Sequence, residues 1–432
     1  MNNIFEYGRL SLTTNNVFKK LVLMIAVVFM VFSCKTIQNK STMVSKATIT
    51  ARSKNVTDIK PSIIIDKTKN IFGAGADNFA GFEKSVLGKR VGVVTNQSGL
   101  LLDDQHLVDY LLAKKVNITK IFAPEHGFRG TADAGELVVD GKDTKTGLPI
   151  LSLYGDNRKP KATQLEDLDV IVFDLQDVGA RFYTYISTLH NVMEACAENK
   201  VSMIILDRPN PNGGIVDGPI LEKTWTTFVG MHPIPVLHGM TIGEYAQMIN
   251  GEKWLKNEVK CDLQVVACSA YDRRMFYDLK VKPSPNLPNA KAINLYASLC
   301  FFEGTNVSVG RGTNKQFQIY GSPFISNGSF IFTPMPNQGA KDPVHNGKDC
   351  FGEDLSTVAP VTKLELKWLL KAYQNTPDKT TFFNQFFTKL AGSKTLQKQI
   401  ESGLTENEIR NTWQNGLKEF KSMRRKYLIY AE

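Results

Sequence analysis

The sequence predicts an α/β protein built on a Rossmann-like, doubly wound, mostly parallel sheet. Between residues 90 and 206, apolar segments rich in β-branched residues alternate with segments whose apolar residues recur at helical spacing. Continuous apolar strands that alternate with amphipathic helices are typical of a parallel sheet covered on both faces. After about residue 256 the alternation gives way to short strands, Pro-rich turns and helices, which predicts a second, smaller α+β C-terminal domain.

The individual elements follow from these patterns. Strands are predicted at 90–97, 118–123, 149–154, 170–175 and 201–206. A helix is predicted after the fourth strand, because one face of it would carry Ile186, Leu189, Met193 and Cys196. Another helix is predicted after Thr241, which forms a capping box with Glu244. No strand is followed by Gly-x-Gly-x-x-Gly, so a dinucleotide cofactor is not indicated.

The first 34 residues predict a lipoprotein signal peptide. Lys19 and Lys20 precede an apolar run, residues 21–32, that is too short to span a bilayer. The run leads into Val-Phe-Ser-Cys, which resembles a bacterial lipobox, in which the cysteine, here Cys34, is acylated. We therefore expect export and a lipid anchor in the bacterial cell envelope, in the periplasm or at the outer membrane.

The rest of the chain divides into three predicted parts. Residues 35–65 are rich in Ser, Thr, Lys and Asn and predict a flexible tether. Residues 66–255 are expected to form the Rossmann-like catalytic domain, and residues 256–432 the α+β domain that completes the cleft.

Composition narrows the classes of partner. The net charge is +10, and residues 1–34 contribute +2 of it, which leaves +8 for the mature chain. A basic protein suits an anionic partner such as a cell-wall polymer or a membrane surface. The chain has no arginine-rich helix and no aromatic RNA motif, so nucleic acid is not an expected partner, and no protein partner is implied.

Cysteines and histidines argue against a metal or another cofactor. The six histidines are scattered, and no Cys/His cluster has zinc-site spacing. The five cysteines beyond Cys34 are expected to be mostly buried, apolar residues. One disulfide is the alternative in an exported protein, and Cys261 and Cys268 lie on one short predicted strand.

Polar side chains collect at the carboxyl ends of the predicted strands, the edge where open α/β sheets bind ligands. Strand 118–123 ends at Pro124 and is followed by Glu125, His126 and Arg129. The other candidates are Asn96, Gln97, Asp174, Asp177, Arg181, Tyr183, Asp207 and Asn210, with Glu303 and Arg311 in a Gly-rich segment of the second domain. Arginine binds carboxylates in a bidentate manner, and aromatic faces stack on sugars, so this set suits a polyhydroxylated, acidic ligand.

Structural roles are the alternative for several of these residues. Asp174 and Asp177 could cap the sheet or pair with Arg181, and Asp207 could belong to a turn. Two functions from different classes fit the set. A glycosidase needs a carboxylic acid and often a second carboxylate, whereas a binding protein for cell-wall fragments would use the same lining without turnover. Metal-assisted hydrolysis is less favoured because the histidines are scattered.

Seven motifs resemble the exo-β-N-acetylmuramidase family, glycoside hydrolases once described as a domain of unknown function. They occur in order within residues 70–432 and read NQSG (96–99), APEHGFRG (123–130), TGLPILSLYG (146–155), VFDLQDVGARFYTY (172–185), DRPNPNGG (207–214), PSPNLP (283–288) and FEGTNVSVGRGT (302–313).

The resemblance implies a Rossmann-like N-terminal half, a smaller C-terminal half and an active site in the cleft between them. It implies that the protein removes terminal N-acetylmuramic acid from the non-reducing end of peptidoglycan fragments, for cell-wall recycling. The catalytic glutamate of the family corresponds to Glu125, which we expect to be the general acid. Our own inference adds catalytic roles for His126, Asp177 and Glu303 and assigns the remaining candidates to substrate binding.

Overall fold

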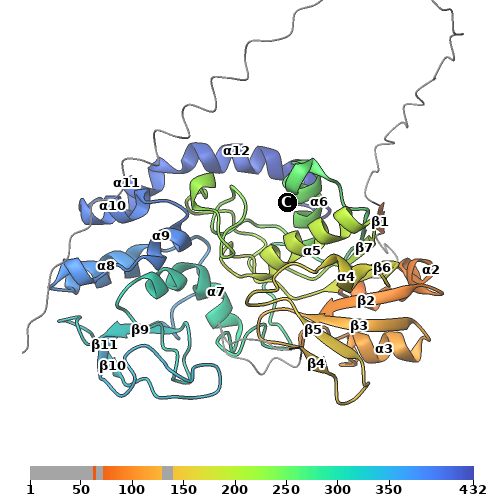
Figure 1. Ribbon diagram of the computed structural model, residues 1–432. Helices are drawn as coiled ribbons and strands as arrows, with labels where there is room; N and C mark the ends of the chain where they lie inside the picture. The colour runs from red at the N-terminus through yellow and green to blue at the C-terminus, as the bar shows by residue number, and fades with distance from the viewer. Residues whose placement is uncertain (1–61, 65–71, 129–139) are drawn as a thin grey trace, which may run out of the picture. The chain divides into compact units, whose positions relative to one another are not determined.

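The computed structural model describes residues 62–64, 72–128 and 140–432 (Figure 1). These residues belong to one compact unit, Ile59–Glu432. The predicted signal peptide with Cys34, most of the predicted tether, and Arg129 lie outside the described residues. The tether was predicted to reach residue 65, but Ser62–Ile64 forms strand β1, because the run Ser-Ile-Ile-Ile is strand-forming.

An eight-stranded, mostly parallel sheet forms the core of the described unit. Its order is β1-β8-β7-β6-β2-β3-β5-β4, and β4 pairs with β5 in the antiparallel direction. The strands after β1 are β2 (Arg90–Thr95), β3 (Asn117–Ala123), β4 (Gly141–Lys142), β5 (Pro149–Ser152), β6 (Val170–Asp174), β7 (Ser202–Leu206) and β8 (Leu263–Val266). From β2 the chain adds β3 and β5 on one side, then returns to add β6, β7 and β8 on the other. This is the doubly wound order, so the predicted fold class is confirmed.

Different helices cover the two faces of the sheet because successive strand residues point to opposite faces. Val93 packs in one buried cluster with Leu107 and Leu111 of α3 (Leu107–Ala113). The next residue, Val94, packs in the other cluster with Met193 of α5 (Tyr185–Asn199) and residues of α6 (Ile242–Gly251). Figure 1 shows α3 on one side of the sheet and α5 and α6 on the other.

Two predicted helices begin where the sequence places them. The apolar face predicted for the helix after β6 is buried in α5. Helix α6 starts with the predicted capping box, in which the Glu244 N–H donates to Thr241 Oγ1 over 3.3 Å and the Thr241 N–H donates to Glu244 Oε2 over 3.0 Å. Two shorter helices, α2 (Glu83–Val86) and α4 (Ala162–Leu165), complete this half.

Strand β8 lies beyond residue 255, where the first domain was predicted to end. It nevertheless pairs with β7 in parallel, from Met203 opposite Leu263 to Leu206 opposite Val266. A short apolar strand has the same sequence pattern in either domain, and only its hydrogen-bonding partner assigns it to the first sheet.

The C-terminal region combines a small antiparallel sheet with helices, as predicted for an α+β domain. Strands β9 (Ile319–Ser322), β10 (Phe330–Phe332) and β11 (Cys350–Asp354) pair in the order β10-β11-β9. The helices are α7 (Ala290–Leu299), α8 (Lys367–Asn375), α9 (Phe386–Ala391), α10 (Thr395–Glu401), α11 (Glu406–Thr412) and α12 (Gln414–Arg424). Short 3₁₀ segments are η1 (Gly75–Asp77), η2 (Phe79–Gly81), η3 (Lys223–Trp225), η4 (Lys256–Glu258), η5 (Cys300–Gly304), η6 (Lys379–Thr381) and η7 (Arg425–Tyr427).

The end of the chain returns to the first sheet. The Tyr430 hydroxyl donates to Asp207 Oδ2 over 2.6 Å, and the Tyr430 N–H donates to Glu244 Oε1 at the start of α6. The two halves of the unit are therefore tied together by buried polar contacts as well as by a shared apolar cluster.

The structure also shows the state of the cysteines and the lengths of the apolar helices. All five described cysteines are buried and free of disulfides, as expected for small apolar residues. Within the described ranges, no helix is long and apolar enough to cross a membrane.

Candidate active site

A cavity of about 890 Å³ opens where the carboxyl ends of β3, β5 and β6 meet the C-terminal region. Glu125 and His126 follow β3, Tyr154 follows β5, and Tyr183 lies in the segment between β6 and α5. The opposite wall comes from α7, η5 and the loops around residues 284–287 and 339–344. The volume is in the range of small-molecule sites, which are about 300–1,000 Å³.

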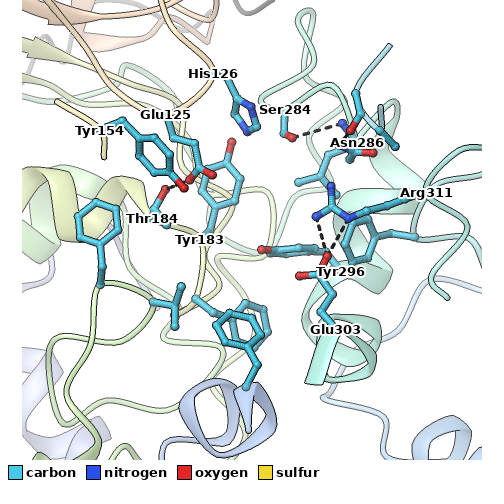
Figure 2. A pocket seen from close by; sticks show the side chains of 18 of the residues that line it. Glu125, His126, Tyr154, Tyr183, Thr184, Ser284, Asn286, Tyr296, Glu303 and Arg311 are labelled. Atoms are coloured by element: carbon cyan, nitrogen blue, oxygen red, sulfur yellow. Dashed lines mark hydrogen bonds and ion pairs between the residues drawn. The ribbon is translucent and has the colours of Figure 1, made fainter. Parts of the chain in front are cut away.

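A tight turn after β3 directs Glu125 into the cavity. Pro124 ends the strand, and the Gly127 N–H donates back to the Pro124 carbonyl over 3.0 Å. His126 and Gly127 adopt φ values of 73° and 74°, a left-handed backbone that is strained for histidine and natural for glycine. The strand end and the turn together hold Glu125 at the rim of the sheet (Figure 2).

Hydroxyl groups surround the carboxylate of Glu125. Thr184 Oγ1 donates to Glu125 Oε2 over 2.7 Å, and Figure 2 shows this contact beside Tyr154. Burial raises the pKa of the Tyr154 hydroxyl, and the charge of Glu125 and a hydrogen bond to it raise this pKa further. Tyr154 therefore stays protonated at neutral pH. Both hydroxyls hold the Glu125 side chain in one orientation.

A second carboxylate faces the cavity from the C-terminal region. Glu303, in η5, accepts at Oε1 from both Arg311 Nε (2.7 Å) and Arg311 Nη2 (2.6 Å). Figure 2 shows this pair on the side of the cavity opposite Glu125 and Thr184. The Arg311 guanidinium carbon also lies 5.2 Å from the centroid of the Phe317 ring, so the pair is fixed by packing as well as by charge.

Aromatic rings form much of the surface between the two carboxylates. Tyr296 packs edge-on against Tyr183 with ring centroids 6.0 Å apart, and against Phe317 with centroids 5.0 Å apart. Phe182 packs edge-on against Tyr296 at 5.4 Å. Such a surface can stack on the apolar face of a sugar ring.

The structure brings five of the predicted site residues together at this cavity: Glu125, His126, Tyr183, Glu303 and Arg311. Gln97 lines a neighbouring cavity of about 860 Å³ instead, and its amide donates to the carbonyl groups of Lys282 and Pro283. Arg129 lies outside the described residues.

Asp174 and Asn96 are buried supports rather than lining residues. Asp174 is fully buried and forms an ion pair with Arg208, with Arg208 Nε 2.5 Å from Oδ1 and Nη2 2.9 Å from Oδ2. Asn96 donates to the Tyr185 hydroxyl over 2.6 Å, and that hydroxyl contacts the Glu125 backbone carbonyl. Both side chains therefore use their hydrogen-bonding groups within the protein, on Arg208 and Tyr185, and not on a ligand.

Arg181 was predicted to bind substrate, but its buried guanidinium donates hydrogen bonds to four backbone carbonyl groups of the protein. Nη1 donates to the carbonyl groups of Pro219 and Ile234, each over 2.7 Å. Nη2 donates to those of Leu390 and Ala391 at the end of α9, over 2.9 and 3.0 Å. Burial without an acidic partner lowers the pKa of Arg181 to about 9. Arg181 therefore joins the two halves of the unit.

Asp207 and Asn210 hold the loop after β7. Asp207 accepts from the Thr241 hydroxyl and the Gly243 N–H, each over 2.8 Å, at the start of α6, and burial raises its pKa to about 6. Asn210 donates to the Met240 carbonyl over 2.9 Å. Both side chains are buried and lie outside the cavity lining.

Asp177 was predicted to be catalytic, and it does not line the cavity. Its Oδ2 accepts from the Gly179 N–H over 2.7 Å and lies 3.8 Å from His238 Nε2. Burial raises the pKa of Asp177 to about 7 and lowers that of His238 to about 3. The pair is therefore a buried structural feature of the loop after β6.

The structure adds lining residues that sequence reasoning missed. They are Tyr154, Arg158, Thr184, Phe228, Ser284, Asn286, Tyr296, Phe317, Phe386 and Lys389. Tyr154, Thr184, Ser284 and Asn286 lie inside motifs quoted above and could have been found there. Arg158 and Phe228 carry no local signal, because only the fold brings them to the cavity.

No metal site is found in the described part of the chain, where no three His, Cys, Asp or Glu side chains form a group that could hold a metal ion. The prediction that turnover needs neither metal nor cofactor stays a prediction.

Known proteins place the chain in a family. Models described as exo-beta-N-acetylmuramidase NamZ, N-terminal and C-terminal, match residues 91–291 and 294–430. The first match includes β8, in agreement with the sheet.

Relatives match over nearly their whole length. Peptidoglycan beta-N-acetylmuramidase NamZ of Bacillus subtilis (strain 168) is 36% identical over 416 residues, which is 90% of this chain and 96% of that protein. Two solved DUF1343 family proteins from Bacteroides fragilis NCTC 9343 have TM-scores of 0.77 and 0.72 at 41% and 28% identity. Each covers 84% of this chain, and the matches span 99% and 100% of those chains. The chain therefore belongs to the NamZ exo-β-N-acetylmuramidase family of glycoside hydrolases.

Proposed function

We propose that this protein releases terminal N-acetylmuramic acid from the non-reducing end of peptidoglycan fragments, with Glu125 as the general acid. Family membership supports the substrate and the exo mode of attack. The observation that carries the role of Glu125 is its position, at a strand end, inside the cavity and held by two hydroxyl groups.

Glu125 has the surroundings that a proton donor needs. A general acid must lie within hydrogen-bond reach of the leaving oxygen, and it is protonated before the proton transfer and ionised after it. The Thr184 hydroxyl can donate to a carboxylate or accept from a carboxylic acid, so its 2.7 Å contact orients Glu125 in either state. The rings of Tyr154 and Tyr183 line the cavity beside it.

Glu303 is the candidate for the second carboxylate of the reaction. It faces the cavity from the side opposite Glu125, and Arg311 fixes its orientation through two contacts of 2.6 and 2.7 Å. A carboxylate in this place can stabilise the positive charge that develops on the sugar ring, activate water or attack the anomeric carbon. The aromatic surface beside Tyr296 would hold the ring between the two carboxylates.

Product analysis tests the proposal. Incubation with peptidoglycan-derived oligosaccharides should release the N-acetylmuramic acid monosaccharide before any internal glycan is shortened. Early release of disaccharides or longer pieces would show an endo enzyme. Absence of turnover on both oligosaccharides and a chromogenic N-acetylmuramic acid glycoside would refute the proposed substrate.

We also propose that the protein acts at the bacterial cell envelope, anchored through acylated Cys34. The support is the sequence pattern alone, a charged flank, a short apolar run and a lipobox-like ending.

A further inference from the structure

The cations that line the cavity differ in what they already bind. Arg311 is compensated by Glu303, with two nitrogen atoms 2.6 and 2.7 Å from one carboxylate oxygen. Arg158 is exposed, lines the cavity and makes no ion pair with any described residue. A positive charge without an acidic partner at a ligand site is suited to an anionic group of the ligand.

Arg158 forms a corner of the cavity with Tyr154 and Phe228, named the Arg158 corner below. Its guanidinium carbon lies 4.5 Å from the centroid of the Phe228 ring, a cation–π contact that restricts the side chain. The Tyr154 and Phe228 rings have centroids 6.3 Å apart. Tyr154 itself is hydrogen-bonded to Glu125, and it lies close enough to Arg158 for that positive charge to lower the pKa of its hydroxyl. One side chain therefore separates this cation from the proposed general acid.

We propose that the Arg158 corner binds the carboxylate of an acidic substituent on the sugar ring held at Glu125, which in N-acetylmuramic acid is the lactyl group. The inference rests on the proposed function. The lactyl ether is carried on C3, two carbons from the anomeric carbon where Glu125 would act, so its carboxylate falls within the reach of a neighbouring side chain.

The chemistry of the corner matches both parts of a lactyl group. A guanidinium offers two parallel N–H donors to a carboxylate, which an ammonium cannot do. The rings of Phe228 and Tyr154 offer apolar surface to the methyl group. N-acetylglucosamine lacks the substituent, so Arg158 would set the preference for the acidic sugar.

Two ligands that differ in the charge of the lactyl group but have nearly the same shape test the proposal. The first is N-acetylmuramic acid, and the second is its methyl ester, which keeps the lactyl group but has no charge. Calorimetric binding of both to the full chain, and turnover of the two corresponding chromogenic glycosides, should be compared for the native protein, Arg158→Gln, Arg158→Lys and Arg274→Gln. Arg274 is an exposed arginine that does not line the cavity and serves as the matched control.

We expect the native protein to bind the acid about 10- to 100-fold more tightly than the ester, the usual effect of one hydrogen bond to a charged group. Arg158→Gln should lose this preference by weakening binding of the acid only. Arg158→Lys should restore part of it, and Arg274→Gln should behave as the native protein.

Two results would overturn the assignment. One is an acid-over-ester preference that survives in Arg158→Gln. The other is an equal loss for both ligands, which indicates a steric or folding effect. If the first of these results is found, loss of the preference in Lys389→Gln would place the carboxylate at α9. Binding is measured apart from turnover, so a protein that binds the acid through Arg158 without cleaving the glycoside refutes the proposed function and leaves this assignment standing.

Discussion

Replacing Glu125 with Gln tests the centre of the proposed mechanism. Glutamine has nearly the same size, and its carbonyl oxygen can still accept the Thr184 hydroxyl that contacts Glu125 Oε2 over 2.7 Å. The variant should therefore fold and bind substrate normally, and the change that remains is the loss of a transferable proton.

The expected loss of turnover is about 10²- to 10⁴-fold, the range found for general acid catalysis, or about 3–5 kcal/mol in the activation free energy. The assay compares two N-acetylmuramic acid glycosides, one with a poor and one with a good leaving group. A poor leaving group depends on protonation, so Glu125→Gln should slow it far more. Glu83→Gln, an exposed residue of α2 outside the cavity, is the control for the chemical change.

The outcome can contradict the reasoning in two ways. If a folded Glu125→Gln slows both substrates equally, Glu125 acts as a nucleophile or a positioning group and another residue supplies the proton. If it slows neither substrate, the cavity at the ends of β3, β5 and β6 is not the catalytic site.

Four further predictions follow from the structure and the sequence. Arg181→Met should lower the free energy of unfolding by about 2–4 kcal/mol in denaturant titrations, because the buried carbonyl groups of Pro219, Leu390 and Ala391 lose their donor, whereas that of Ile234 keeps the Leu221 N–H; an unchanged midpoint would refute the bridging role. Asp177, with a pKa of about 7 against 3.8 for the unfolded chain, destabilises the folded state as pH rises through this window. Asp177→Asn should thus gain stability over the native protein between pH 4.5 and 8, by up to about 4 kcal/mol, and a constant difference would contradict the shift. Turnover should survive dialysis against a strong chelator, whereas loss that a divalent ion restores would indicate a metal enzyme. Cys34→Ala should not be acylated and should leave the detergent phase, and unchanged partitioning would exclude the anchor.

The sequence by itself determined the fold class and predicted the centre of the candidate site. The period of the apolar residues defined strands β2, β3, β5, β6 and β7 and the buried face of α5, since local periodicity reflects which side of an element is covered. The position of Glu125, behind Pro124 at a strand end, predicted a residue at the sheet rim. Motif resemblance added the cleft, and the polar residues of the Gly-rich segment predicted Glu303 and Arg311 as members of the site.

Tertiary structure decided which polar residues are available to a ligand. Arg181, Asp174 and Asp207 resemble binding residues in the sequence, yet each binds another part of the protein. Arg181 donates to Leu390 and Ala391, Asp174 pairs with Arg208, and Asp207 accepts from Tyr430. Most of these partners lie far away along the chain, and whether a charge is compensated depends on neighbours that only the folded chain brings close. The same reason explains why Arg158 was not predicted as a site residue. Arg158 has no recognisable motif, and packing against Phe228 is what places its charge at the cavity.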